Sequence, residues 1–282
     1  MPVCPSCETS VLEESYLETY TAPFNNQEYK LYHCLKCDLH WWEPLEIVPE
    51  FYEQEGEEDY AILHMGIDRP IGENHKMFFK HVPLKSGRLL DVGCGDGVFL
   101  VEAQKRGYEV WGIDFDRKSI QVCQEKRGLK NTFAMTPWEF AEFCQKENLK
   151  FDIITFFEVL EHQDKPREFL EAVKNMLKPG GWIAGSVPNV NIDRMGGIYR
   201  KIYRYMHRHD LPPNHLLRFS INALKKILEH AGFNQVILEP TKSDLRSLAS
   251  LYQKALLDDS INKKVSYYIK NSKFQRYAKT KY

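Results

Sequence analysis

Apolar side chains follow two alternating patterns through the central part of the chain. Short hydrophobic runs of strand length occupy residues 89–92, 109–114 and 151–157, and another begins at Trp182. Between these runs, apolar residues recur with the helical period of about 3.6. The helical segments span about 98–106, 117–127, 137–147 and 166–177. Strands that alternate with helices predict an α/β fold, in which a mostly parallel, Rossmann-like sheet is covered by helices on both faces.

Two helix starts carry capping signals. The segment Thr136-Pro137-Trp138-Glu139 has the form of a capping box with proline at the first helical position. Ser220 has the position of an N-cap for a helix over 221–231, which ends at Gly232. Residues 241–282 have the pattern of amphipathic helices with scattered lysines and tyrosines, and a short strand over 265–269 is an open alternative. We expect a basic, mostly helical tail.

Length and composition are those of an ordinary globular protein. The 282 residues suffice for one large domain, or for one domain with a small appendage. Hydrophobic residues make up 43% of the chain and charged residues 27%, which is ordinary for a soluble globular protein. No apolar run approaches the roughly 20 residues that span a bilayer, and residues 1–5 do not begin a secretory signal. We therefore expect a cytoplasmic protein without a transmembrane segment.

The net charge of −1 conceals an uneven distribution of charge. Residues 1–60 contain 2 basic and 14 acidic side chains, whereas residues 241–282 contain 10 basic and 3 acidic ones. The two ends can attract each other, within one chain or between subunits, or either end can bind a charged ligand. The sequence decides neither between these alternatives nor the oligomeric state.

The most informative segment joins the first strand of the α/β pattern to the following helix. Gly93, Gly95 and Gly97 stand there at alternate positions, and Asp91 comes just before them. Asp114 ends the next strand, 21 residues after Gly93, where a βαβ unit brings a carboxylate to ribose hydroxyls. The glycine spacing differs from the dinucleotide fingerprint G-x-G-x-x-G, and Asp91 would repel a pyrophosphate. S-adenosylmethionine (SAM) has an ammonium group for Asp91 and no phosphate, so we predict SAM as the cofactor.

This segment resembles the D-x-G-x-G-x-G motif of class I SAM-dependent methyltransferases, particularly the group that acts on small molecules. The residues 159–162 are similar to the family's "VLEH" segment, and the residues 177–181 to its "LKPGG" segment. The resemblance covers about residues 75–240, and it implies methyltransferase activity. It also implies the residues that surround the cofactor, which are Asp91, Gly93, Cys94, Gly95, Gly97, Asp114, Phe115, Met135, Thr136 and Phe157.

Four of the seven cysteines form two C-x-x-C pairs near the N-terminus. Their positions are Cys4, Cys7, Cys34 and Cys37, with 26 residues between the pairs. Two such knuckles with a hairpin between them predict a zinc ribbon, and four thiolates leave no open position, so the Zn²⁺ would be structural. The ribbon's acidic charge argues against nucleic acid as its partner and favours docking on the core. Cys94, Cys123 and Cys144 fall in the core pattern and are expected to be buried.

The methyl acceptor should meet the loops after the fourth and fifth strands, because ligands of open α/β sheets bind at the carboxyl ends of strands. The loop 188–219 is unusually long. Within it, residues 198–206 form an amphipathic pattern with a basic face, and Tyr199, Arg200 and Tyr203 are candidate acceptor-binding residues. Three roles are open for this segment: a lid helix with solvated arginines, a site for an anionic acceptor, or peripheral contact with a lipid surface.

Two histidines are candidates for the general base. Residues 215–220 resemble the "HLxxFS" stretch of small-molecule methyltransferases, which implies that His215 lies near the cofactor's methyl group. Methyl transfer requires positioning of the acceptor and removal of its proton, and an imidazole titrates close to neutral pH. His162 is the second candidate, and a backbone hydrogen-bonding role is the alternative for both. Arg218 could hold a carboxylate or phosphate of the acceptor.

Together, these patterns predict four parts of the chain: a zinc ribbon (1–48), a linker with lid helices (49–84), a SAM-binding core (85–240) and the tail (241–282). The leading hypothesis is a SAM-dependent methyltransferase that acts on a hydroxyl of a sugar or lipid-linked intermediate. An RNA methyltransferase with a zinc module, and a non-catalytic partner protein with the same fold, are the alternatives. The acceptor's identity, and the choice between O-, N- and C-methylation, are not determined by the sequence.

Overall fold

The computed structural model describes residues 2–12, 15–52, 58–189 and 210–239. Residues 1–189 and 212–238 form one compact unit, which contains almost all of the described chain. The expected helix over 198–206, with Tyr199, Arg200 and Tyr203, lies outside the described residues. The expected tail over 241–282, with its alternative strand, also lies outside them.

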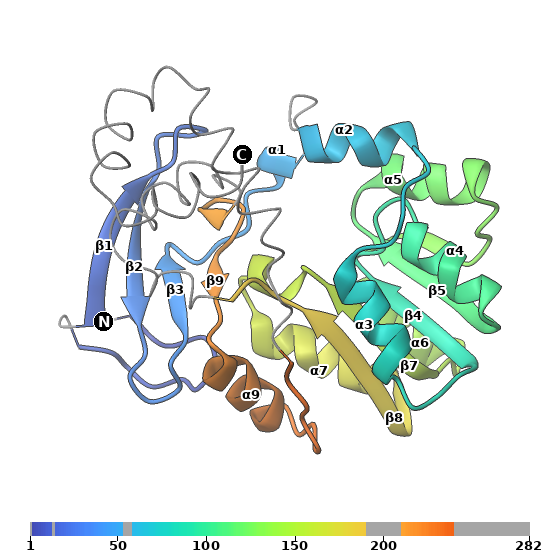
Figure 1. Ribbon diagram of the computed structural model, residues 1–282. Helices are drawn as coiled ribbons and strands as arrows, with labels where there is room; N and C mark the ends of the chain where they lie inside the picture. Colours follow the sequence, from blue (N-terminus) through green and yellow to red (C-terminus); the bar gives the residue numbers. More distant parts are fainter. Residues whose placement is uncertain (1, 13–14, 53–57, 190–209, 240–282) are drawn as a thin grey trace, which may run out of the picture. The chain divides into compact units, whose positions relative to one another are not determined.

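The compact unit is built on a five-stranded parallel sheet, and this confirms the predicted fold class (Figure 1). Its strands, in spatial order, are β6 (Thr132–Ala134), β5 (Tyr108–Asp114), β4 (Gly87–Val92), β7 (Phe151–Phe157) and β8 (Leu177–Ser186). Strand β4 is central, with β5 on one side and β7 on the other. The register places Asp91 opposite Gly112 of β5 and Thr155 of β7. The carboxyl ends of β4, β5 and β7 therefore meet at one edge of the sheet.

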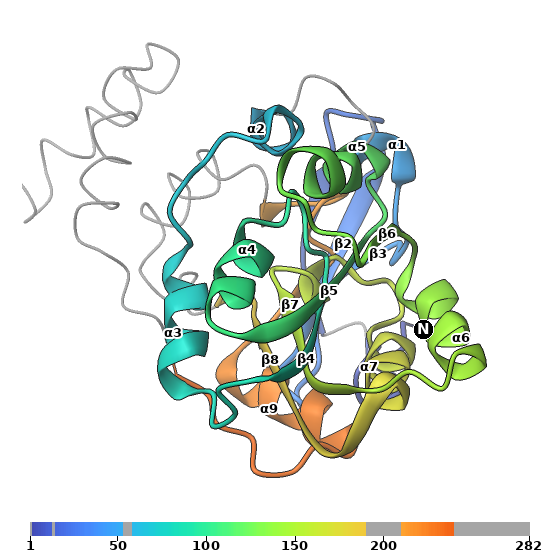
Figure 2. The same ribbon diagram turned by 90° about the vertical axis from the view of Figure 1, so that its right-hand side faces the viewer.

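Helices cover both faces of this sheet (Figure 2). One face carries α3 (Glu73–His81), α4 (Val98–Lys105) and α5 (Arg117–Gln121). The other face carries α6 (Pro137–Lys146), α7 (Pro166–Met176) and α9 (Ile221–His230). Adjacent residues of one strand serve the two cores: Leu89 packs with the first set of helices and Leu90 with the second, and both are fully buried. Burial on both faces explains why the strands are almost continuously apolar.

The predicted capping signals are confirmed. The Thr136 hydroxyl accepts from the Glu139 N–H at 3.3 Å, while the Glu139 carboxylate accepts from the Thr136 N–H at 2.8 Å, which completes the capping box of α6. The Ser220 hydroxyl accepts from the Ala223 N–H at 3.0 Å at the start of α9. Each side-chain oxygen satisfies a backbone donor that the helix itself leaves without a partner.

Two predicted elements differ in detail from the structure. The segment expected as one helix over 117–127 is α5 followed by a π-helical turn, η2 (Val122–Lys126). This wider turn directs Cys123 and Arg127 at the glycine segment, where the Cys123 thiol lies 3.2 Å from the Gly95 carbonyl oxygen. Strand β8 begins at Leu177 rather than Trp182, because its first residue already pairs with Phe151 before the Pro-Gly turn bulges out of the ladder.

The N-terminal residues form a second, antiparallel sheet. Its first three strands are β1 (Tyr16–Thr21), β2 (Glu28–His33) and β3 (His40–Glu43). The fourth is β9 (Leu217–Arg218), which comes from the loop before α9 and pairs with β3. The sequence analysis did not predict β9. Trp41 and Trp42 of β3 are fully buried, and Trp41 belongs to the same hydrophobic cluster as the helices α6, α7 and α9.

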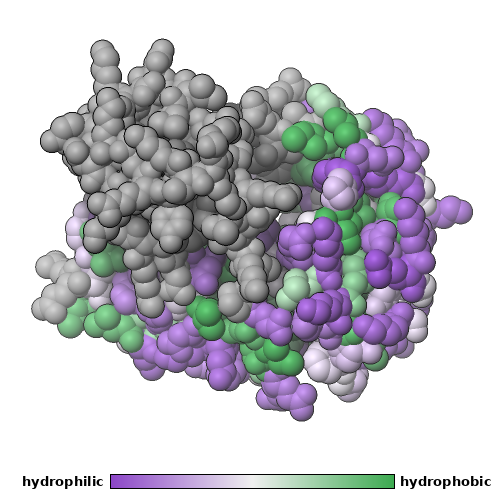
Figure 3. Space-filling model, in the orientation of Figure 1, coloured by the Kyte–Doolittle hydropathy of each residue, from purple (hydrophilic) through white to green (hydrophobic). Residues whose placement is uncertain are grey.

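The two sheets are joined by a segment with the short helices α1 (Pro49–Tyr52) and α2 (Glu58–Met65), followed by α3. Among the described residues, no helix is long and apolar enough to cross a membrane. Hydrophobic and hydrophilic residues are interspersed on the visible described surface, with hydrophobic colouring near α2 (Figure 3). Ile62 and Met65 of α2 are 42% and 59% exposed.

A buried carboxylate in the glycine segment forms ion pairs with two arginines from other parts of the chain. Asp96, between Gly95 and Gly97, is 1% exposed. Arg69 donates to both of its oxygens, at 2.7 and 2.8 Å, and Arg127 donates to one of them at 2.7 Å. Because Arg69 follows α2 and Arg127 follows η2, this one side chain holds two separate segments against the turn. Arg127 also donates to the exposed Asp68 at 3.0 Å.

We expect Asp96→Asn to lower the free energy of unfolding by about 3 kcal/mol, because it leaves two guanidinium groups without their buried anion. Urea denaturation would measure the change. Asp68→Asn is the matched control, since it removes the partner of the same Arg127 at a side chain that is 99% exposed; a loss of at most about 0.5 kcal/mol is expected there. Equal losses in the two variants would contradict this account.

Candidate functional site

The glycine segment is a tight turn that only glycine fits at its first and last positions. Gly93 and Gly97 have φ of +74° and +78°, in the left-handed region. A Cβ at Gly93 would lie 2.5 Å from Val159, and a Cβ at Gly97 would lie 2.5 Å from Leu129. Glycine is therefore required at these two positions both by the backbone conformation and by the close packing around them.

Asp91 lies in β4, just before this turn, and is 3% exposed. Its carboxylate accepts a hydrogen bond from the Thr155 hydroxyl at 2.6 Å, across the ladder between β4 and β7. Burial raises the pKa of Asp91 well above its usual range, and the neighbouring Asp114 carboxylate acts in the same direction. A buried acid of this kind gains from a nearby cation, so its chemistry fits the ammonium group of SAM.

Asp114 ends β5 and faces the turn. One carboxylate oxygen accepts from the Gly95 N–H and the other from the Asp116 N–H, both at 2.9 Å. Burial raises the pKa of Asp114 to about 6, although these two backbone donors act in the opposite direction. The carboxylate is thus fixed in orientation at the end of its strand, where a ribose would be expected.

The remaining predicted cofactor residues differ in their surroundings. Phe115 is 54% exposed and makes an edge contact with Tyr52, with 5.3 Å between ring centroids. The Met135 N–H donates to the Asp114 carbonyl, and Thr136 caps α6. Cys94 is 7% exposed, as expected for a buried thiol, and Cys123 and Cys144 are buried as well.

Phe157 packs in an aromatic cluster with two side chains, His75 and Phe99, with 4.6 and 5.0 Å between ring centroids.

The two candidate bases lie together, beyond the carboxyl end of β7. His162 ends the short 3-10 helix η3 (Leu160–His162), which follows that strand. The His162 and His215 rings are 4.7 Å apart at an angle of 79°. Glu161, which is 1% exposed, joins them: one ligand atom from each of the three side chains lies within 4.8 Å of the other two.

Tyr52 connects this group to the cofactor end of the site. Its ring contacts Phe115, and its hydroxyl donates to the Asn214 carbonyl oxygen at 3.3 Å and lies 3.4 Å from His162 Nδ1. Burial and the nearby Glu161 carboxylate raise the pKa of the Tyr52 hydroxyl. The sequence analysis did not predict Tyr52, Glu161 or Asn214 as site residues. For Glu161 the adjacency to His162 in the "VLEH" segment was an available signal, whereas Tyr52 had none beyond its aromatic, acidic surroundings.

Arg218 lies in β9, where it pairs with His40 of β3. Its side chain is half-buried. Its predicted role in acceptor binding stays a prediction.

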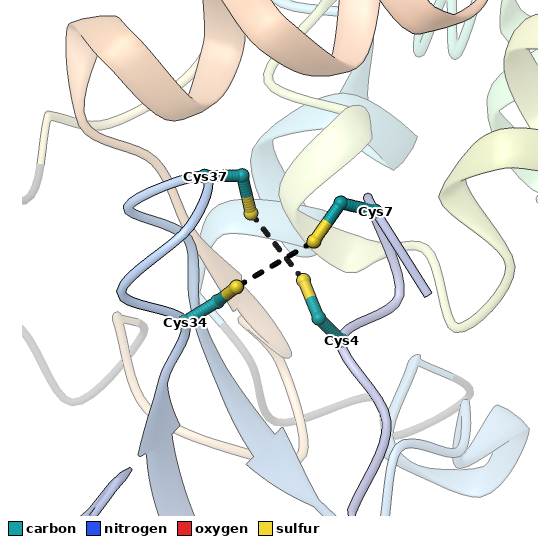
Figure 4. Close-up of side chains that lie close together, drawn as sticks. All are labelled: Cys4, Cys7, Cys34 and Cys37. Atoms are coloured by element: carbon teal, nitrogen blue, oxygen red, sulfur yellow. Dashed lines mark hydrogen bonds between the residues drawn. The ribbon is translucent and has the colours of Figure 1, made fainter. Parts of the chain in front are cut away.

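The four predicted cysteine ligands converge on one point (Figure 4). Cys4 and Cys37 Sγ are 3.4 Å apart, and Cys7 and Cys34 Sγ are 3.5 Å apart. These distances exceed a disulfide bond of about 2.05 Å and are close to the ~3.8 Å between sulfurs around a tetrahedral Zn²⁺ with bonds of about 2.3 Å. A hydrogen bond from Cys4 lowers the pKa of the Cys37 thiol to about 5. The donor set fits a structural Zn²⁺.

The two knuckles that carry these cysteines have the same backbone form. The Cys4 N–H donates to the Thr9 carbonyl while its own carbonyl accepts from Glu8, and Cys34 repeats the pattern with Leu39 and Asp38. Glu8 and Asp38 both have positive φ, at 55° and 66°. Repetition of one turn in both knuckles turns the two pairs of thiols toward each other.

The cysteine sheet is bonded directly to the histidine group. The Trp42 N–H of β3 donates to the Leu216 carbonyl at 3.0 Å, and the Leu216 N–H donates to the Glu161 carbonyl at 2.9 Å. His215 therefore directly precedes a segment that is held on one side by the N-terminal sheet and on the other by η3. Ser220 adds a further contact, with its hydroxyl 3.3 Å from the Asp38 carbonyl oxygen.

The central part of the chain matches a family model of known proteins. The model described as a methyltransferase domain matches residues 66–238, which is more than half of the chain. This range contains the glycine turn, both aspartates and the histidine group.

Curated relatives that match include enzymes of ubiquinone biosynthesis by name. A ubiquinone biosynthesis O-methyltransferase of Paraburkholderia phymatum is 33% identical over 119 residues, which cover 42% of this chain and 51% of the relative. The enzyme with the same name from Paracidovorax citrulli is 36% identical over 115 residues, covering 39% and 47%. The chain thus spans about half the length of the curated relatives it matches.

Among solved structures, phosphoethanolamine N-methyltransferase 2 of Haemonchus contortus, in complex with SAM, is similar in fold. The TM-score is 0.52 at 16% sequence identity, and the match covers 81% of this chain and 53% of that one. At this identity the likeness supports the fold alone.

We expect the purified chain to contain about one zinc ion, because four buried or half-buried thiols form a closed tetrahedral donor set. Elemental analysis should show loss of this zinc in Cys7→Ser and in Cys34→Ser, with unfolding of the N-terminal sheet. Cys144→Ser is the control, since Cys144 is a buried cysteine outside the cluster and should leave the zinc content unchanged. Full zinc in all three variants would refute the assignment.

Proposed function

The chain belongs to the methyltransferase-domain family, and from that premise we propose that it transfers a methyl group from SAM to a hydroxyl of a small-molecule acceptor. One observation carries the proposal. A buried aspartate, a second aspartate that is hydrogen-bonded to the glycine turn, and a histidine pair lie at the carboxyl ends of the three neighbouring strands β4, β5 and β7. Donor and acceptor chemistry would thereby meet at a single edge of the sheet.

In this proposal the residues of the chain bind and orient. Asp91 would face the ammonium group of SAM, Asp114 would accept hydrogen bonds from its ribose, and the turn with Gly93, Gly95 and Gly97 would lie against its methionine part. Phe115, Met135, Thr136, Cys94 and Phe157 would line the remainder. SAM supplies an electrophilic methyl group when it is bound. The chain has to align the acceptor oxygen and take its proton, and His215 is the candidate base, with His162 as the second candidate.

The class of acceptor is supported by two different arguments. The curated relatives are O-methyltransferases by name, which favours an oxygen nucleophile. The basic pattern over 198–208 favours a sugar or lipid-linked intermediate with an anionic group, which Tyr199, Arg200, Tyr203 and Arg218 would bind. This second argument rests on sequence, since residues 190–209 are outside the described residues.

Two alternative functions are an RNA methyltransferase and a non-catalytic partner protein. An RNA methyltransferase would need a positively charged surface, and the acidic N-terminal residues argue against one there. A non-catalytic partner protein would have no need for a buried Asp91 or for an Asp114 carboxylate fixed by two backbone donors. Both alternatives remain outcomes of the labelling experiment described below.

We expect the affinity for SAM to depend on pH through Asp114. Its pKa is raised to about 6, so the carboxylate that accepts from the ribose is lost as the pH falls below that value. Affinity should fall by up to about tenfold per pH unit below 6 if only the carboxylate form binds. Two other carboxylates, those of Asp116 and Asp91, interact electrostatically with Asp114. His64 is paired with Asp116 and so is a further titratable group behind it. Calorimetric titrations from pH 5 to 7.5 would measure it.

Two variants separate these groups in that titration. Asp114→Asn should bind SAM weakly without the dependence below pH 6, whereas His64→Gln should keep the dependence. A wild-type affinity that is constant from pH 5 to 7 would rule out Asp114 as the ribose acceptor.

Transfer itself would be tested with methyl-labelled SAM and a cell extract separated into metabolite, lipid-linked glycan, protein and RNA fractions. We expect label in the metabolite or glycan fraction, reduced about a hundredfold or more in His215→Ala. His230→Ala, a change at an exposed histidine of α9, is the control and should retain activity. Label in RNA would mean that the acceptor is RNA and not a small molecule. SAM binding without any transfer would favour a non-catalytic binding protein.

A further inference from the structure

We propose that Glu161, His162 and His215 together bind one divalent transition-metal ion, separate from the cysteine cluster. A ligand atom from each side chain lies within 4.8 Å of the other two, a spacing that one ion can bridge. Two imidazoles and one carboxylate are a donor set for ions such as Mn²⁺, Fe²⁺, Co²⁺ and Zn²⁺, and three protein ligands leave positions open for further oxygens. The role of the ion in methyl transfer rests on the function proposed above, but its binding does not.

The backbone already holds the three side chains together. Glu161 and His162 are consecutive residues of η3, so both lie just beyond the carboxyl end of β7. The Leu216 N–H donates to the Glu161 carbonyl at 2.9 Å, which brings the residue before it, His215, beside that helix. The ring contact between the two histidines then completes the arrangement. An ion would enter a group whose geometry is set by hydrogen bonds elsewhere, which lowers the cost of ordering its ligands.

The hydrogen bonds of His162 favour a ligand role. Its Nδ1 lies 2.8 Å from the Asn214 carbonyl oxygen, which can only accept, so Nδ1 carries the proton. Nε2 then carries the lone pair that a metal requires. Histidine ligands of metals commonly donate their other N–H to a backbone carbonyl in this way. The Tyr52 hydroxyl donates to the same carbonyl at 3.3 Å, so this acceptor is held by a second donor beside His162.

The charge of Glu161 favours a cation at this point. The side chain is 1% exposed, and opposite charges attract more strongly away from water. A divalent ion held by this carboxylate and the two imidazoles would therefore be attracted strongly. The same group follows β7, one strand away from Asp91 in β4 and two strands away from Asp114 in β5, so an ion here would lie at the same edge of the sheet as the expected cofactor position.

The ion would refine the role that we assign to His215. An acceptor hydroxyl that coordinates the ion has a lowered pKa and passes its proton to solvent. The resulting oxygen anion forms its bond to the methyl carbon while the bond from that carbon to sulfur breaks, and the electron pair of that bond stays on sulfur. In this form His215 would hold the ion in position as a ligand and would affect the proton only through the metal.

The test is binding of Mn²⁺ to the full, zinc-loaded chain, followed by electron paramagnetic resonance. Mn²⁺ is chosen because it prefers oxygen and nitrogen donors, so it leaves the cysteine cluster undisturbed. We expect about one bound Mn²⁺ per chain, with affinity reduced at least tenfold in Glu161→Gln and in His215→Ala. His230→Ala should bind as tightly as the unaltered chain. Circular dichroism and SAM titration of each variant would establish that the fold is retained.

A second measurement needs no variant. Pulsed resonance of the bound Mn²⁺ in the unaltered chain should detect coupling to imidazole nitrogens, and its absence would overturn the proposal. So would a failure to bind Mn²⁺ in a chain that binds SAM, or methyl transfer that continues undiminished after chelation with the cysteine-bound zinc still in place; His215 would then act as a direct base. Mn²⁺ binding without SAM binding would leave this proposal standing and refute the proposed function.

Discussion

The parallel register of β4, β5 and β7 is the constraint on which the candidate site depends. Because the three strands run in the same direction and end at the same edge, residues far apart in sequence come together there: Asp91, Asp114 and the segment with Glu161. None of these side chains could take its position through local structure alone. The hydrophobic cores on the two faces fix the sheet, and the sheet in turn fixes the distance between the expected cofactor position and the histidines.

The N-terminal sheet is part of the same construction. Strand β9 belongs to the loop that carries His215, yet it completes the sheet that begins with the cysteine knuckles. Hydrogen bonds run without a break from Trp42 through Leu216 to Glu161. A change in the order of the N-terminal sheet would therefore reach the histidine group through main-chain bonds. The sheet that carries the cysteine cluster and the candidate site are thus connected through the main chain.

Features with local signals could be predicted from the sequence, and features that depend on distant partners could not. The strands, the caps of α6 and α9 and the glycine turn follow from short-range patterns, and all of them are present. Asp96 lies inside the most readable motif, but its partners Arg69 and Arg127 are 27 and 31 residues away, and nothing in the motif indicates them. Strand β9 has only two residues, too few for any periodicity. Tyr52 meets a partner 110 residues later.

The pairing of β3 with β9 also has a consequence for the order of events during synthesis. Residues 40–43 leave the ribosome about 175 residues before residues 217–218, an interval of roughly 9–35 s at ordinary rates of translation. Throughout that interval one edge of the new sheet, with Trp41 and Trp42, has no strand beside it. Uncovered edges of this kind recruit other chains. The nascent N-terminus must therefore be kept from premature association until the last strand of its sheet has been made.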